Sequence, residues 1–204
     1  MINRFAYTSM TGAKASTEQL AVTSNNLANS LTPGFREVIS AYRAVPLRGD
    51  GVPFTGNGAD TRVFAVDTTP GSNFNQGQLQ TTGNSLDVAI KGDGMFAVRR
   101  PDGQEAYTRA GKFMVNDVGL LMVGKDVPVV GVGGSITIPV GAIVQIAEDG
   151  AVYTQIPGNQ FLNQAGKLKL VNPNINSLVR AADGLFDIPG EQAAPDASVR
   201  VVQG

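Results

Sequence analysis

Asp-Gly pairs recur along this 204-residue chain, and their carboxylates are the side chains best suited by type to act as general acids or bases. Asp93, Asp102 and Asp149 each precede a glycine. Two carboxylates whose surroundings drive their pKa values apart can hydrolyse glycosidic bonds, so a carboxylate-dependent hydrolase acting on cell wall is one hypothesis. An Asp-Gly pair is also typical of a tight turn with positive φ. Turn chemistry explains all three, and we predict no catalytic residue.

The composition excludes several other classes of site. The chain has no Cys and no His, which rules out zinc sites built on those ligands, Ser-His-Asp triads, Cys nucleophiles and disulfides. The glycine-rich residues 131–134 match neither the Rossmann nor the P-loop spacing. A net charge of −1, with scattered Lys and Arg, gives no attraction to nucleic acid. We predict no cofactor, no metal and no nucleic-acid partner.

The low charge of the surface favours contacts between proteins, and the hydropathy of the chain bears on secretion and membrane insertion. Only 16% of the residues are charged, which leaves much of the surface uncharged and available for subunit contacts. The N-terminus lacks the apolar region of a cleavable secretory signal, and no apolar stretch approaches the roughly 20 residues that span a bilayer. We therefore expect no direct membrane insertion.

Residues 1–32 are expected to form one long helix that needs other helices. Proline is absent until Pro33, which Gly34 follows, and this pair is a stop signal. Small or apolar residues recur every seven positions, on one face in coiled-coil fashion: Ala6, Ala13, Leu20 and Leu27. A neighbouring row holds Ala15, Val22 and Asn29. Few residues here are charged, so we predict a helix that is loosely ordered alone and firm in an assembly.

The rest of the chain reads as short strands separated by turns, so the predicted fold class is α+β. The β domain, residues 76–190, is expected to be mainly antiparallel and barrel-like or sandwich-like. An extended connector, residues 33–75, precedes it, and residues 191–204 follow as a return segment. The predicted strands are Arg62–Asp67, Leu86–Lys91, Met95–Arg99, Glu105–Thr108, Phe113–Val115, Leu120–Val123, Ile136–Ile138, Val144–Ala147, Leu168–Val171 and Val199–Val202.

The end of the predicted helix carries an Asn-rich run, Asn25-Asn26-Leu27-Ala28-Asn29, and then a turn, Thr32-Pro33-Gly34-Phe35. Asn and Ala near a helix end can be ordinary capping and packing residues. On a weakly charged helix the same Asn side chains can hydrogen-bond across helix contacts and specify register. We predict that the run is a subunit interface. In the turn, the proline ends the helix, the glycine relaxes φ, and the phenylalanine pins the exit against the core.

These residues resemble the signature of flagellar rod and hook proteins, in which an N-terminal helix carries an NNLAN core and ends in a TPGF turn. A second block, residues 82–98, resembles the opening of that family's β domain. Residues 105–113 resemble the AYTRxGxF segment that follows it. The resemblance covers residues 1–36 and 76–150 well. Within the family the chain is most similar to the proximal-rod F-type subunit.

The resemblance implies a structural subunit of the flagellar basal-body rod that polymerises into the periplasmic drive shaft, with copies of itself and other rod subunits as partners. It also implies an inner tube of helices, an outer layer of β domains, and export by the flagellar type III apparatus. Family members end in a C-terminal helix that pairs with the N-terminal one, and this sequence stops at Gly204, where that helix is expected to begin. Alternatives are a free-standing glycan-binding or ligand-binding β module, and a distal-rod or hook-type subunit.

Overall fold

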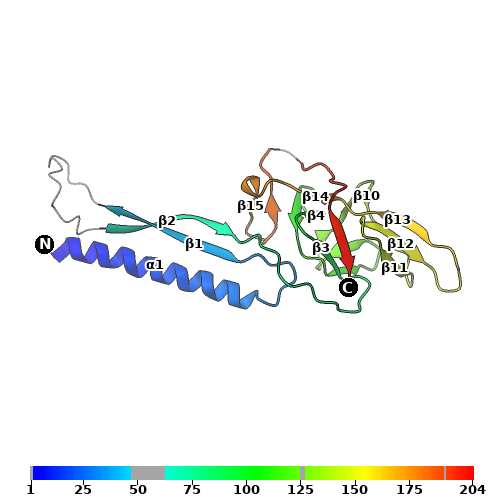
Figure 1. Ribbon diagram of the computed structural model, residues 1–204, viewed down its shortest axis with the longest axis horizontal. Helices are drawn as coiled ribbons and strands as arrows, with labels where there is room; N and C mark the ends of the chain where they lie inside the picture. Colours follow the sequence, from blue (N-terminus) through cyan, green and yellow to red (C-terminus); the bar gives the residue numbers. More distant parts are fainter. Residues whose placement is uncertain (1, 47–62, 125–126, 191) are drawn as a thin grey trace. The chain divides into compact units, whose positions relative to one another are not determined.

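The computed structural model describes residues 2–46, 63–124, 127–190 and 192–204 (Figure 1). The chain divides into two compact units. The first, which we call the helical unit, comprises Met1–Leu31 and Arg36–Phe74. The second, the β unit, comprises Thr32–Phe35 and Asn75–Gly204.

The helical unit is one helix beside one hairpin. Its elements are α1 (Ile2–Ala28), β1 (Val38–Pro46) and β2 (Val63–Ser72). The two strands pair antiparallel, with an irregularity between Ile39 and Ala41, and the hairpin lies alongside α1 (Figure 1). Segment 33–75, expected to be an extended connector, thus contains paired strands. The sequence of β1 explains the pairing, since its β-branched and aromatic residues suit a pleated surface. Residues 47–62 of the connector lie outside the described residues.

Helix α1 ends at Ala28, four residues before the predicted end. The Asn29 backbone N–H and side-chain Nδ2 both donate to the Asn25 carbonyl oxygen, at 3.1 and 2.9 Å. The backbone N–H and hydroxyl of Ser30 both donate to the Leu27 carbonyl oxygen, at 3.2 and 2.8 Å. These bonds occupy the last helical carbonyls and tighten the final turn, which ends the helix before Pro33 is reached.

The β unit is built from short antiparallel strands. Its five-stranded sheet has the order β14 (Leu170–Val171), β4 (Met95–Arg99), β5 (Glu105–Thr108), β16 (Phe186–Asp187), β15 (Val179–Arg180). Two three-stranded sheets are β11 (Ile143–Ile146), β12 (Ala151–Gln155), β13 (Asn163–Lys167) and β6 (Phe113–Val115), β7 (Leu121–Val123), β8 (Val127–Pro128). The remaining elements are the pairs β10 (Gly134–Ser135) with β9 (Val130–Gly131) and β17 (Arg200–Gln203) with β3 (Val88–Lys91), and the 3₁₀ helix η1 (Ile175–Ser177).

The α+β class is confirmed, with mainly antiparallel sheets, whereas the barrel alternative is wrong for the described residues. The five-stranded sheet ends at β14 on one edge and β15 on the other, and these two-residue strands do not pair with each other. Closing a barrel requires continuous pairing around the sheet. Strands this short, separated by turns, do not supply it.

The strands predicted at Met95–Arg99, Glu105–Thr108 and Phe113–Val115 are confirmed with their bounds. The strand predicted at Ile136–Ile138 is wrong. Ile136 and Ile138 are buried, but only Thr137 between them makes a bridge, to Leu120. Pro139 follows and has no N–H to continue a ladder.

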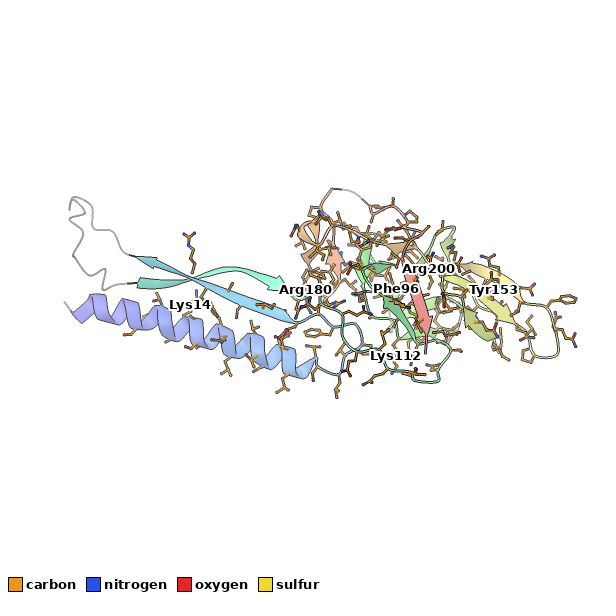
Figure 2. All side chains as sticks on the ribbon, in the orientation of Figure 1. Lys14, Phe96, Lys112, Tyr153, Arg180 and Arg200 are labelled. Carbon is orange, nitrogen blue, oxygen red and sulfur yellow. The ribbon has the colours of Figure 1, made fainter. Side chains whose placement is uncertain are left out.

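A single hydrophobic core holds the β unit together. It draws side chains from β3, β4, β6, β7, β11, β12, β14 and β17. Phe96 lies at its centre with no exposed surface (Figure 2), and its ring meets that of Phe113 edge to face at 5.1 Å between centroids. Because β17 belongs to this core, residues 200–203 of the predicted return segment are an integral part of the β unit.

Candidate assembly surface

Helix α1 packs against its own hairpin through one stripe of side chains. Half-buried residues recur at intervals of three or four, which places them on one face: Thr11, Ala15, Glu18, Val22 and Asn26. The Tyr42 hydroxyl on β1 donates a hydrogen bond of 2.9 Å to the Ala15 carbonyl oxygen. The stripe contains Ala15 and Val22 of the row that the sequence places beside the heptad positions. Ala15 and Val22 of this row therefore face the hairpin of their own chain.

The opposite face of α1 carries the predicted heptad positions Ala6, Ala13, Leu20 and Leu27, which we call the assembly row. All four are exposed, Leu20 by 67% and Leu27 by 74%. At about 100° per residue the row lies across the helix from the half-buried stripe. Within the part of the chain that the structure describes, no element covers this face. Exposed apolar side chains that line one side of a helix mark an interaction surface.

Charge contributes little to this surface. Apart from Arg4, the charged residues of α1 are Lys14 and Glu18, which form an i,i+4 pair at 3.6 Å between an exposed Lys14 and the half-buried Glu18. The hydroxyls of Thr17 and Thr23 donate to carbonyl oxygens four residues earlier in the helix, at 3.0 and 2.9 Å. The threonines are therefore satisfied locally, and apolar contact is the main interaction that the exposed face offers.

The Asn-rich run divides between the two faces. Asn25, Leu27 and Ala28 are exposed, as a subunit interface requires. Asn26 is half-buried and pairs with the backbone of Val38: its Nδ2 donates to the carbonyl oxygen at 2.9 Å, and its Oδ1 accepts from the N–H at 3.0 Å. This amide mimics one rung of a β-ladder and fixes the end of α1 to β1. Asn29 is half-buried and bonds to Asn25, so both inward asparagines are engaged within the chain.

The predicted turn Thr32–Phe35 belongs to the β unit. The Phe35 N–H donates to the Thr32 carbonyl oxygen at 3.1 Å, and Gly34 has a φ of +71°. Proline at the second position and a positive-φ glycine at the third are typical of a type II turn. A Cβ added at Gly34 would lie 2.3 Å from the backbone of Arg109, so only glycine fits. The sequence predicts only the relaxed φ of Gly34; the close approach to the Arg109 backbone is an additional constraint.

Phe35 is held by a cation–π contact. The Arg180 guanidinium carbon lies 4.9 Å from the centre of the Phe35 ring and 5.9 Å from that of Phe186 (Figure 2 labels Arg180). Burial lowers the pKa of Arg180 from its usual range, which reflects how far the guanidinium has left the solvent. Arg180 was not predicted as a partner of Phe35, because the strand that carries Arg180, β15, was not predicted.

The motif of residues 82–98 has a structural explanation. The Thr82 hydroxyl donates to Asp87 Oδ2 at 2.8 Å, and Asn84 Nδ2 donates to Asp87 Oδ1 at 3.0 Å. The Asp87 carbonyl oxygen accepts from the Gly204 N–H at 2.8 Å, and Gln203 Nε2 donates to the Ser85 carbonyl oxygen at 2.6 Å. The network positions the start of β3 and joins it to the end of β17.

The AYTRAGKF segment also serves packing. Gly111 lies so close to β3 that an added Cβ would be 1.5 Å from the Val88 carbonyl oxygen, and the Val88 N–H donates to the Gly111 carbonyl oxygen at 2.8 Å. Tyr107 is 1% exposed, donates to Glu105 Oε1 at 3.0 Å and accepts from the Ala193 N–H at 2.8 Å. Burial raises the pKa of Tyr107 to about 12, and the neighbouring Glu105 carboxylate adds to the rise.

A buried ion pair lies beside Tyr107. Lys169 Nζ donates to both carboxylate oxygens of Glu105, at 2.7 and 2.9 Å, and the two side chains are 12% and 8% exposed. The pair links β5 to the segment that precedes β14. Neither residue was among the predicted site residues. A charged residue within a predicted strand was the available signal, but its distant partner could not be identified from spacing.

Two of the three Asp-Gly carboxylates, Asp102 and Asp149, accept hydrogen bonds within their turns. Asp102 Oδ1 accepts from the Gln104 N–H at 2.9 Å, and Asp149 Oδ1 accepts from the Ala151 N–H at 3.1 Å. Lys167 Nζ binds Asp149 Oδ2 at 2.9 Å and holds the pKa of that carboxyl below its usual range. Among the described residues, no three Asp or Glu side chains gather into a group that could hold a metal ion.

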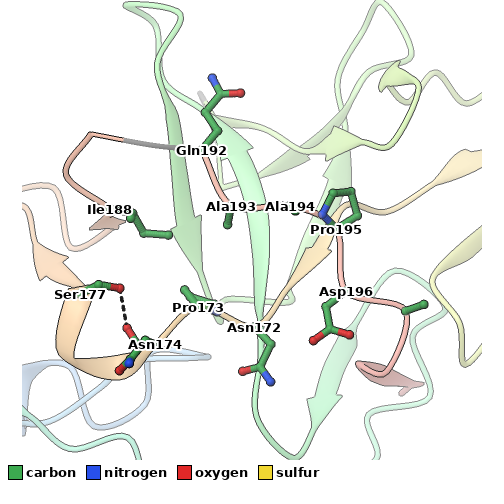
Figure 3. Close-up of a pocket in the computed structure, with 11 residues that line it drawn as sticks. Asn172, Pro173, Asn174, Ser177, Ile188, Gln192, Ala193, Ala194, Pro195 and Asp196 are labelled. Carbon is green, nitrogen blue, oxygen red and sulfur yellow. Dashed lines mark hydrogen bonds between the residues drawn. The ribbon is translucent and has the colours of Figure 1, made fainter.

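A hollow of about 550 Å³ opens beside η1 and the segment before β17 (Figure 3). Two of its polar side chains, Ser177 and Asp196, bond to groups close to them in the chain. The Ser177 hydroxyl donates to the Asn174 carbonyl oxygen at 2.7 Å, and Asp196 Oδ1 accepts from the N–H and hydroxyl of Ser198, at 2.8 and 2.7 Å. These bonds hold the pKa of Asp196 below its usual range. The remaining lining mixes two polar residues, Asn172 and Gln192, with apolar ones: Pro173, Ile188, Ala193, Ala194, Pro195 and Ala197.

Two known protein families match parts of this chain. Residues 7–36 match the family described as "Flagella basal body rod protein", and residues 89–154 match the "Flagellar hook protein FlgE/F/G D1 domain". None of the described helices combines the length and apolar character needed to cross a membrane.

Whole-chain relatives are F-type and G-type rod proteins. The chain is 40% identical to flagellar basal-body rod protein FlgF of Salmonella typhimurium and 38% identical to FlgF of Escherichia coli, in each case over 97% of this chain and 79% of the relative. It is 33% identical to FlgG of Agrobacterium fabrum, over 91% of this chain and 74% of the relative. These matches show that the chain belongs to the flagellar basal-body rod protein family.

Proposed function

We propose that this chain polymerises, with copies of itself and with other rod subunits, into the periplasmic drive shaft that transmits motor torque to the hook. The observation that carries the proposal is the assembly row of Ala6, Ala13, Leu20 and Leu27, which stays exposed on the face of α1 opposite its own hairpin. Contacts of the coiled-coil type with helices of neighbouring subunits would remove this row from water.

The division of α1 into two faces supports this role. Its half-buried stripe positions the helix on β1 and β2, so the opposite face is presented in a fixed direction. Fully burying Leu20 and Leu27 would contribute roughly 1.5–3 kcal/mol each. Contacts of this size, repeated in many subunits, add up to a stiff polymer. The proposed mechanism is mechanical, because transmission of torque requires many repeated subunit contacts and no chemical reaction. We therefore propose that the chain is not an enzyme.

The test replaces the apolar row by charge. Leu20→Asp and Leu27→Asp each place a carboxylate on the surface that is to be buried, which costs far more than the lost apolar contact. We expect both variants to be absent from isolated basal bodies and to fail to restore motility to a strain lacking the parent gene. Circular dichroism should show the β unit still folded.

Gln19→Glu is the matched control. Gln19 is exposed and adjacent to Leu20 in the chain, but it lies off the assembly row, so the variant adds a similar charge without burying it. This variant should enter basal bodies as the parent chain does. Full motility with Leu20→Asp and Leu27→Asp would refute the assignment of the row to assembly.

A further inference from the structure

The side chains of the assembly row change in size along α1. The N-terminal half of the row holds Ala6 and Ala13, and the C-terminal half holds Leu20 and Leu27. Each alanine is followed, 14 residues later, by a leucine. Two parallel copies of α1 that are shifted by 14 residues therefore bring each leucine in the overlap level with an alanine of the other copy. At about 1.5 Å per residue, this shift is about 21 Å along the helix axis.

A second exposed row of α1 follows the same interval. Met10, Thr17 and Ser24 each lie four residues after a member of the assembly row, and all three are exposed, Met10 by 68%. Two rows spaced alternately by four and three residues form the seam of a coiled coil. The same shift brings Met10 of one copy level with Ser24 of the other. No residue of either row is charged, so ion pairs within the seam do not select the register.

Side-chain size distinguishes this register from the others. The separation of two packed helices depends on the side chains at the contact, so layers with one large and one small side chain keep it even. Without a shift, Leu20 meets Leu20 and Ala6 meets Ala6, which separates the helices at one end and leaves a gap at the other. A shift of seven residues brings Leu20 against Leu27 and the two alanines against each other. A reversed helix gives a two-fold contact, which closes after two copies and by itself builds no polymer.

We propose that α1 packs parallel to α1 of a second copy of this chain, shifted by 14 residues, so that the leucines of one copy cover the alanines of the other. The inference rests on the proposed function and specifies its contact. Each copy offers two different halves of its seam, so the contact is head-to-tail and can repeat. Two successive shifts just exceed the 27 residues of α1, so the helix of a third copy begins where that of the first ends. The repeat therefore covers both halves of every seam.

Cysteine cross-linking measures the register directly, since the parent chain contains no cysteine. Met10→Cys and Ser24→Cys are combined in the full chain, which keeps the whole assembly row, and basal bodies isolated from cells are oxidised. A disulfide needs Cα atoms within about 7 Å, so it reports which positions are level. We expect a ladder of covalent multimers from this double variant and monomers from each single variant. Thr17→Cys with Ser24→Cys is the matched control, since these positions lie on the same row only seven residues apart, and it should give no ladder.

An exchange of side-chain size tests the same contact without cross-linking. Ala13→Leu places a second leucine in the layer of Leu27, and Leu27→Ala leaves two alanines there. In cells without the parent chain, each variant should enter basal bodies about tenfold less, because overpacking and cavities both weaken a packed contact. The double variant Ala13→Leu/Leu27→Ala again has one large and one small side chain in that layer, so most of the incorporation should return.

The outcomes separate this inference from the proposed function. With the parent chain present in basal bodies, no ladder from the Met10→Cys/Ser24→Cys variant, or no recovery in the size exchange, would overturn the inference alone. So would a ladder from the Thr17→Cys/Ser24→Cys control, which indicates a shift of seven residues, or a dimer from Ser24→Cys, which indicates unshifted helices. A parent chain absent from basal bodies would overturn the proposed function and this inference with it.

Discussion

Lys169→Met should destabilise the β unit severely, because it leaves the Glu105 carboxylate buried without its cation. Glu105 is 8% exposed and accepts both bonds of 2.7 and 2.9 Å from Lys169 Nζ. Removing one partner of a buried pair costs about 3–5 kcal/mol. For a unit of this size, each kcal/mol lowers Tm by roughly 3–5 °C. We expect a loss of about 9–25 °C, measured by differential scanning calorimetry of the full chain.

Lys167→Met is the matched control. Lys167 lies two residues away and pairs with Asp149 at 2.9 Å, but the side chains are 42% and 51% exposed. An exposed pair contributes at most about 1 kcal/mol, so Tm should fall by no more than a few degrees.

The double variant Glu105→Gln/Lys169→Met separates the two explanations for a loss. Gln removes the unpaired charge and still offers an acceptor to the Tyr107 hydroxyl, so most of the lost stability should return. Equal Tm losses for Lys169→Met and Lys167→Met, or a double variant no more stable than Lys169→Met, would refute the reasoning that burial of an unpaired charge is the cause.

Three further outcomes are expected. Gly34→Ala should expose the turn to proteolysis, because a left-handed backbone costs a non-glycine residue about 1–2 kcal/mol and its Cβ also meets backbone. Gly103→Ala, with a φ of +87° and open space around it, incurs only the first cost and should be cleaved more slowly than Gly34→Ala; equal cleavage of the two variants would contradict the steric argument. The pKa of Tyr107 is about 12 in the folded chain against 10.0 ordinarily, so the stability that the buried phenol contributes is intact below pH 10 and is lost as the pH rises through 12. Tyr107→Phe should therefore make Tm less dependent on pH between 10 and 12. An unchanged dependence of Tm on pH would contradict the assignment. Asn26→Ala removes both bonds to Val38 and should speed hydrogen exchange at the Val38 amide by tenfold or more, while circular dichroism still reports α1.

Local patterns in the sequence predict many of the strands. Strands flanked by Asp-Gly turns, such as Met95–Arg99 and Glu105–Thr108, could be predicted because alternation and turn chemistry are encoded within a few residues. Strand β13, Asn163–Lys167, was missed because its sequence, Asn-Gln-Ala-Gly-Lys, has no β-branched or aromatic residue and pairs only through tertiary context.

The candidate surface was partly predictable for a related reason. Seven-residue spacing identifies which helix residues share a face, and the exposure of Leu20 and Leu27 agrees with that spacing. Spacing does not say which face the hairpin covers, so Asn26 was grouped with the outward residues although its amide pairs with Val38. Contacts between distant residues, such as Arg180 with Phe35 and Lys169 with Glu105, depend on the folded topology and leave no local pattern.

The near absence of charge on the outward face of α1 has a consequence for how a polymer of this chain would respond to its surroundings. At 0.1 M salt, dissolved ions largely screen charge–charge attraction beyond a distance of about 10 Å, but they do not weaken the removal of Leu and Ala surface from water. Joints made through this face would therefore keep their strength between dilute and saline media. They would loosen on cooling, as apolar association does, and a filament built on them would be more sensitive to cold than to brine.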